Sequence, residues 1–231
     1  MTTRPAPRAT RSTRPTGWVP FALVALVVVP AVAGALRLVE LAGGPLLLPA
    51  NPRMTASPVP VVVHVAGAVP YAVLGAFQFS AGIRRRHPRW HRASGRLVVV
   101  LGLAVALSAL WMTLFYPRQP GTGGLAVLFR LAFGSGMAAC IVLGFSAIRR
   151  GDVATHRAWM TRAYALALGA GTQVVTLGVA GAAFGSSAVV HDLALGAGWA
   201  INLAVAESVL HRHAARSPVR AVGAPAPVGS R

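Results

Sequence analysis

Residues 97–116 read LVVVLGLAVALSALWMTLFY, and this stretch decides the fold class. None of its side chains is charged, and most of them are aliphatic or aromatic. A helix that crosses the hydrocarbon core of a bilayer needs about 20 predominantly apolar residues. The stretch therefore predicts a helix that spans a membrane.

Similar apolar runs recur along the chain of 231 residues. Hydrophobic residues make up 55% of the sequence and charged residues only 11%, whereas a soluble domain carries about 25% charged residues. This small number of charged residues is not enough to cover the surface of a soluble globular protein. The composition therefore indicates that lipid surrounds much of the chain. We predict an all-α, polytopic membrane helix bundle over 18–213 with six transmembrane helices, at 18–39, 58–81, 97–116, 125–147, 161–183 and 189–210.

The basic residues are distributed unevenly between the predicted loops. The formal net charge is +18, and all 22 basic residues are arginine. Eighteen of them lie in the N-terminal tail, the loops after the second and fourth spans, and the C-terminal tail. Because cytoplasmic loops are enriched in arginine and lysine, this pattern predicts cytoplasmic N and C termini and a multi-pass protein of the bacterial cytoplasmic membrane. It favours the lipid bilayer, not nucleic acid, as the partner.

The two ends of the chain are predicted to be disordered tails, at 1–17 and 214–231, because they are rich in arginine, proline and small residues. The first span follows a basic leader, as a signal peptide does. Its apolar run is long for a signal core, so we expect an uncleaved anchor. The single cysteine, Cys140, excludes an internal disulfide and a cysteine-rich metal site.

Polar residues within the spans carry the functional information, because ionisable groups in a membrane are costly. They fall into two layers. The outer layer comprises His64, His191 and Asp192. The inner layer is larger and comprises Gln78, His87, His91, Arg96, Asp152, His156, Trp159, Met160, Arg162, Asn202 and Glu207.

Several inner residues have a structural explanation. Gly151 suits a left-handed helix C-cap, and Asp152 suits the N-cap of the next helix. Glu207 and His211 are four residues apart and are expected to pair on one helix face. Tyr164, like Trp159, suits an interfacial aromatic belt.

Three separated motifs resemble a known family. They are His64-x-x-Gly67 followed by Gln78-Phe79 and His87-Pro88-x-x-His91-Arg92-x-x-Gly95-Arg96; Arg149-Arg150-Gly151-Asp152-x-x-x-His156-Arg157-x-Trp159-Met160-x-Arg162; and Asn202 followed by Glu207. In this order they resemble the bacterial membrane proteins catalogued as domain of unknown function 2306, over about residues 55–210. The resemblance implies a membrane fold and no established activity.

One hypothesis for the polar layers is a redox protein that binds b-type haem. Bis-histidine haem needs two imidazoles from facing helices. His64 with His191 is the candidate pair near the outer face, and His91 with His156 is the pair near the inner face. Arg96 or Arg162 is then the expected partner of a haem propionate.

The alternatives are non-enzymatic. An inward-facing site for an anionic lipid headgroup or a small anion would draw on Gln78, Arg96, Arg162, Asn202 and Glu207, because arginine clusters beside membrane helices attract anionic headgroups. A small transporter is a further alternative, although few charges lie near the midplane. No metal site is predicted, because His87, His91 and His156 have no acidic or cysteine ligand close in sequence. Whether the chain is an enzyme, and its oligomeric state, stay open.

Overall fold

The computed structural model describes residues 17–216, which are helical apart from short connections and contain no strand. The predicted all-α membrane bundle is confirmed for this part of the chain. Nearly all of the two predicted tails lies outside the described residues. Residues 214–216 of the predicted C-terminal tail are described, and they belong to the last helix, which ends at Arg216.

Within residues 17–216, four unbroken helices are long and apolar enough to cross a membrane. They are α4 (Pro58–Gln78), α6 (Pro88–Phe115), α7 (Gly124–Arg149) and α10 (Ala188–Arg216). Their positions match four predicted spans, but α6 begins nine residues before the predicted 97. The reason is that the helix continues through its arginine-rich first turns back to Pro88, which occupies the first helical position.

Two further predicted spans are each broken into a bent pair of helices. The first consists of α1 (Val19–Leu26) and α2 (Val28–Leu41), which meet at 47°. The second consists of α8 (Val153–Ala167) and α9 (Gly169–Phe184), which meet at 44°. Counting each pair as one span gives the six spans that the sequence predicts. Two short helices, α3 (Pro52–Ala56) and α5 (Ala81–Arg86), lie in the connections.

The break between α8 and α9 is filled by a tryptophan from α10. The indole Nε1 of Trp199 donates to the carbonyl of Leu166, at 3.1 Å. A Cβ on Gly169 would lie only 2.2 Å from this indole nitrogen, so the close approach requires glycine there. The tryptophan therefore supplies a side-chain donor to a carbonyl at the bend, where the regular helical hydrogen bonding is interrupted.

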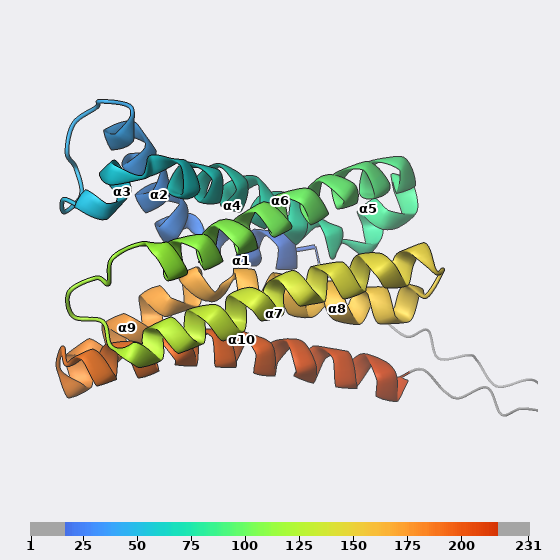
Figure 1. Ribbon diagram of the computed structural model, residues 1–231. Coiled ribbons are helices and arrows are strands. Elements are labelled where there is room, and N and C mark those ends of the chain that lie inside the picture. The colour runs from blue at the N-terminus through green and yellow to red at the C-terminus, as the bar shows by residue number, and fades with distance from the viewer. Residues whose placement is uncertain (1–16, 217–231) are drawn as a thin grey trace, which may run out of the picture.

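The helices pack as neighbouring pairs, with α4 against α6, α7 against α8, and α9 against α10 (Figure 1). The core between α4, α6 and α8 contains two buried tyrosines. Tyr71 of α4 lies on Gly102 of α6, while Tyr164 of α8 lies on Gly75 of α4. The hydroxyl of Tyr164 donates to the carbonyl of Ala72, at 2.7 Å. Tyr164 is thus a core residue, and the prediction that it belongs to an interfacial belt is wrong.

The outer surface of α6 is apolar, as expected for contact with lipid. Val100, Leu107 and Leu114 recur every seven residues and are 58–64% exposed. On the opposite side of the same helix, Val98 and Val105 are buried. A soluble helix reverses this pattern, with polar residues on its exposed face.

The two ends of the bundle differ in charge. Helix α5, the turn between α7 and α8, and the end of α10 lie together at one end (Figure 1). We call this the arginine-rich end, because it holds the arginines of 84–96, 149–162 and 212–216. The opposite end contains the α2–α3, α6–α7 and α9–α10 connections (Figure 1). The described structure therefore separates the basic residues as the loop charges predict, but it does not itself place either end in the cytoplasm.

Candidate functional site

The arginine-rich end holds a group of basic residues around His91 of α6. Arg84 of α5, Arg92 of α6 and His156 of α8 all act electrostatically on the His91 imidazole. No acidic group acts on it among the described residues. The His91 Nδ1 is buried and has no hydrogen-bond partner within the described chain. We call these four residues the His91 cluster, and among the described residues no carboxylate forms an ion pair with its two arginines.

Local capping fixes the position of each member of the cluster. Ser80 accepts a hydrogen bond from the backbone of Ile83 and so begins α5, which carries Arg84. His87 is the N-cap residue of α6, and Pro88 follows it. Because α6 begins at Pro88, His91 lies one helical turn inside α6 and not in the connection between α5 and α6.

His156 is positioned by the motif that precedes it. Gly151 has a φ of 80°, a left-handed conformation that glycine adopts without strain. The carboxylate of Asp152 accepts from the backbone N–H of Thr155, at 3.0 Å, and caps α8. Both predicted caps are confirmed. One turn further on, His156 Nδ1 lies 2.9 Å from the carbonyl oxygen of Gly144 on α7. Because a carbonyl only accepts, His156 donates through Nδ1 and leaves Nε2 available.

Gln78 contacts the same region, but its partner is a serine. Its side-chain nitrogen donates to the hydroxyl of Ser94, at 2.8 Å, and that hydroxyl donates to the carbonyl of Trp90. Gly95 lies beside the Gln78 amide oxygen. The first motif therefore ties the end of α4 to the start of α6.

Arg162 of α8 and Glu207 of α10 form an ion pair with each other. Two hydrogen bonds join them, from Nε to Oε1 at 2.6 Å and from Nη2 to Oε2 at 2.9 Å. The guanidinium also lies over the ring of Trp159, 5.0 Å from its centroid. The main partner of Glu207 is therefore Arg162, and the prediction that Glu207 pairs with His211 named the wrong partner. The guanidinium of Arg162 binds both carboxylate oxygens in a bidentate manner.

The other predicted ligand residues lie apart from this pair. Asn202 of α10 accepts from the hydroxyl of Thr172 on α9, at 2.8 Å, and its side-chain nitrogen is buried without a partner within the described chain. Arg96 is exposed on α6. The structure thus joins Arg162 with Glu207 but shows no contact of Arg96 or Asn202 with them.

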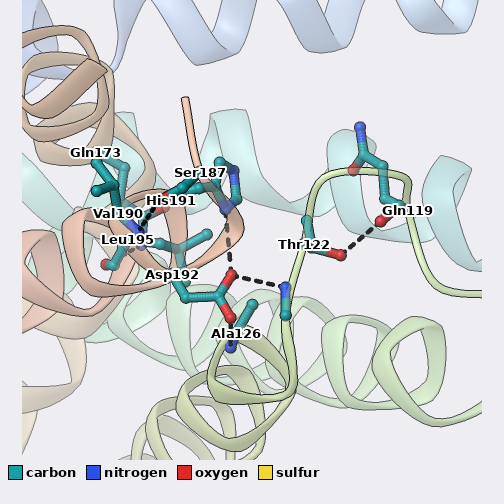
Figure 2. A network of polar contacts seen from close by, with 10 residues as sticks. Gln119, Thr122, Ala126, Gln173, Ser187, Val190, His191, Asp192 and Leu195 are labelled. Carbon is teal, nitrogen blue, oxygen red and sulfur yellow. Dashed lines mark hydrogen bonds and ion pairs between the residues drawn. The ribbon is translucent and has the colours of Figure 1, made fainter. Parts of the chain in front are cut away.

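The outer histidines point to different partners. His64 Nδ1 lies 3.1 Å from the carbonyl of Val105 and 3.2 Å from the hydroxyl of Ser108, both on α6. His191 Nδ1 lies 3.3 Å from a carboxylate oxygen of Asp192 on α10 (Figure 2). No contact joins the two imidazoles in the described structure, so their pairing around a haem stays a prediction.

Asp192 has a role that sequence reasoning missed. It is almost completely buried, and its two carboxylate oxygens accept from the backbone N–H groups of Gly123 and Ala126 at the start of α7 (Figure 2). These partners lie more than sixty residues away in sequence, so no local pattern reveals them. Among the described residues, no group of three or more histidine, cysteine or acidic side chains is arranged to hold a metal ion.

The comparisons with known proteins agree with the membrane fold. The family described as predicted membrane protein, DUF2306, matches residues 61–210, which is more than half of the chain. The match includes the His91 cluster, the Arg162–Glu207 pair and Asp192. No curated protein and no solved structure matches the chain.

Proposed function

The chain belongs to the DUF2306 family of predicted membrane proteins, and we propose that it binds the phosphate of an anionic lipid headgroup at the His91 cluster. The observation that carries the proposal is the buried, unpartnered Nδ1 of His91 among three other basic groups. A buried polar atom without a partner costs about 1–3 kcal/mol. A phosphate oxygen that accepts from this nitrogen removes that cost and offsets the positive charge.

The contrast with Arg162 supports the choice of residues. Glu207 already occupies two donors of the Arg162 guanidinium and neutralises its charge. Arg84 and Arg92 have exposed side chains and no carboxylate partner among the described residues. Anionic ligands therefore gain more at the His91 cluster than at the Arg162–Glu207 pair. The proposal keeps the arginine-rich end of the sequence-based hypothesis, but it replaces the residues named there with the His91 cluster.

We also propose that this end faces the cytoplasm, because the loops there carry most of the arginines. Cytoplasmic leaflets contain anionic lipids, and each basic residue near their surface adds about 1 kcal/mol of attraction. A green fluorescent protein fused after Arg231 should fluoresce in cells, and an alkaline phosphatase fused there should be inactive. The reverse result would contradict this orientation.

The lipid proposal is tested by native mass spectrometry of the purified full-length chain with defined lipids. Phosphatidylglycerol should be retained in preference to phosphatidylcholine, and the Arg84→Gln, Arg92→Gln double variant should retain about tenfold less of it. Arg85→Gln with Arg86→Gln is the matched control, since it removes the same total charge from the same end of the bundle, within α5. Equal losses in both double variants would mean that only general charge matters and would overturn a specific site.

Inorganic phosphate distinguishes a lipid from a free anion. If millimolar phosphate displaces the lipid, the headgroup phosphate alone is the recognised chemistry. If it does not, the acyl chains contribute to binding as well. His91→Phe should weaken binding in either case, because it removes the Nδ1 donor and keeps a ring of similar shape.

A second candidate function is haem binding by His91 and His156. It is favoured by the hydrogen bond from His156 Nδ1 to the Gly144 carbonyl, because such a bond orients the opposite ring nitrogen toward a metal. An absorption spectrum of the dithionite-reduced protein decides this proposal: Soret and alpha bands that disappear in His156→Phe would support it, and their absence from the parent protein would contradict it.

A further inference from the structure

A cavity of about 380 Å³ lies at the end of the bundle opposite to the His91 cluster. Its walls are the loop between α6 and α7, the last turns of α9 and the first turns of α10. The polar residues that line it are Gln119, Thr122, Ser186 and His191, and the apolar ones include Leu177 and Ala180. Its volume is at the lower end of the range for small-molecule sites, about 300–1,000 Å³.

The loop wall of the cavity is held in place by hydrogen bonds. The hydroxyl of Thr122 donates to the carbonyl of Gln119, at 2.7 Å (Figure 2). The side-chain oxygen of Gln119 accepts from Arg53, at 2.8 Å. Asp192 then fixes the next residue, Gly123, through its backbone N–H. Hydrogen bonds within the chain therefore hold this wall of the cavity.

Asp192 also determines which nitrogen of His191 has a partner within the protein. The carboxylate accepts from two backbone N–H groups and has His191 Nδ1 3.3 Å away (Figure 2). A carboxylate in such a network only accepts, so Nδ1 carries the proton. In the neutral imidazole, Nε2 is then a hydrogen-bond acceptor. It is also the only polar atom of this cavity-lining side chain without an assigned partner in the described structure.

From these contacts we infer that the cavity binds a small, neutral, amphipathic molecule that donates a hydroxyl to Nε2 of His191. The apolar walls from α9 and α10 suit a hydrocarbon body, and the single acceptor on the histidine suits one hydroxyl. An anionic ligand is disfavoured because the carboxylate of Asp192 lies directly beside the imidazole of His191. This site is separate from the proposed lipid site, so either proposal can fail without the other.

The test uses 2-naphthol as the probe and 2-methoxynaphthalene as a probe that lacks the donor hydroxyl. Binding to the full chain in nanodiscs is measured by equilibrium dialysis, with protein-free nanodiscs as the blank. We expect saturable binding of 2-naphthol to one site per chain. The methoxy compound should bind about tenfold more weakly, the effect of one lost hydrogen bond in an apolar site. His191→Phe should reduce 2-naphthol binding to the level of the methoxy compound.

A cavity-filling variant tests the location without changing the histidine. Gly181 lines the cavity, and a Cβ there would have no atom within 4 Å, so Gly181→Leu should fold and occupy the space. It should weaken 2-naphthol binding by at least about tenfold. Gly178→Leu is the matched control, because Gly178 is also in α9 and also faces open space, yet it does not line the cavity. Absence of saturable binding, or equal binding by the two leucine variants, would overturn the inference.

Discussion

Arg162 of α8 and Glu207 of α10 are joined by two parallel hydrogen bonds across 45 residues of sequence. Their side chains remain 28% and 37% exposed, so water screens part of the attraction. The pair also links the bent α8–α9 unit to the last helix near the arginine-rich end. Its contribution to stability is therefore positive but limited by exposure.

We expect a double-mutant cycle on this pair to give a coupling free energy of about 1 kcal/mol. Arg162→Met and Glu207→Met should each lower the free energy of unfolding in mixed micelles, and the double variant should lose less than the sum. Arg157→Met is the control partner, because the Arg157 side chain makes no hydrogen bond in the described structure. Strict additivity for Arg162 and Glu207 would show that the ion pair is not formed in the membrane.

The Arg162–Glu207 pair also shows how far the sequence predicts this site. The caps at Gly151 and Asp152 were predictable because the residues that they serve are within a few positions. The partner of Glu207 was not, because a pair four residues apart, Glu207 with His211, is the only one visible along a single helix. The bidentate ion pair with Arg162 is evident only from the packing of α8 against α10.

The fold, like the site, has features that the sequence predicts and features that only the tertiary structure reveals. The number and order of apolar runs predicted the spans, because bilayer thickness fixes their length. The bend at Leu168 was not predicted, because residues 161–183 form one predominantly apolar run without a proline. The available signal was the pair Gly169 and Gly171, whose missing side chains admit Trp199 and the carbonyl of Leu26. Identifying those neighbours requires the tertiary structure.

Replacing Gly75 by alanine should destabilise the bundle. A Cβ at this position would lie 2.4 Å from Tyr164 Cε2, in a core where Tyr164 is held by its bond to Ala72. We expect Gly75→Ala to lower the free energy of unfolding by about 1–3 kcal/mol. Gly178→Ala, which meets no atom within 4 Å, is the control and should be neutral or slightly stabilising. A neutral Gly75→Ala would mean that α4 and α8 are further apart than described.

The cap at Asp152 should make stability depend on pH in the acid range. Hydrogen bonds from Thr155 hold the pKa of the Asp152 carboxyl below its ordinary value of 3.8. A group whose pKa is lower in the folded state stabilises that state above its unfolded pKa, and the contribution is lost as pH falls through the folded pKa. The loss therefore begins below about pH 4, near the unfolded value.

The measurement is the midpoint of thermal unfolding between pH 3 and pH 7 for the parent chain and Asp152→Asn. Asparagine keeps a capping oxygen but does not titrate. The parent chain should lose more stability on acidification than the variant, and the two curves should approach each other at low pH. A constant difference across the whole range would show that the carboxylate charge is irrelevant to the cap.

Asp192 should be required to order the start of α7. Asp192→Leu removes both acceptors and leaves two N–H groups unpaired, that of Ala126 in a buried position and that of Gly123 in a partly buried one. An unsatisfied buried donor costs about 1–3 kcal/mol, so the amide hydrogens of these two residues should exchange much faster. Asp192→Asn keeps one acceptor oxygen and should show a smaller effect. Unchanged exchange at Gly123 and Ala126 in the leucine variant would contradict the cross-helix cap, because no other acceptor for these groups is present in the described structure.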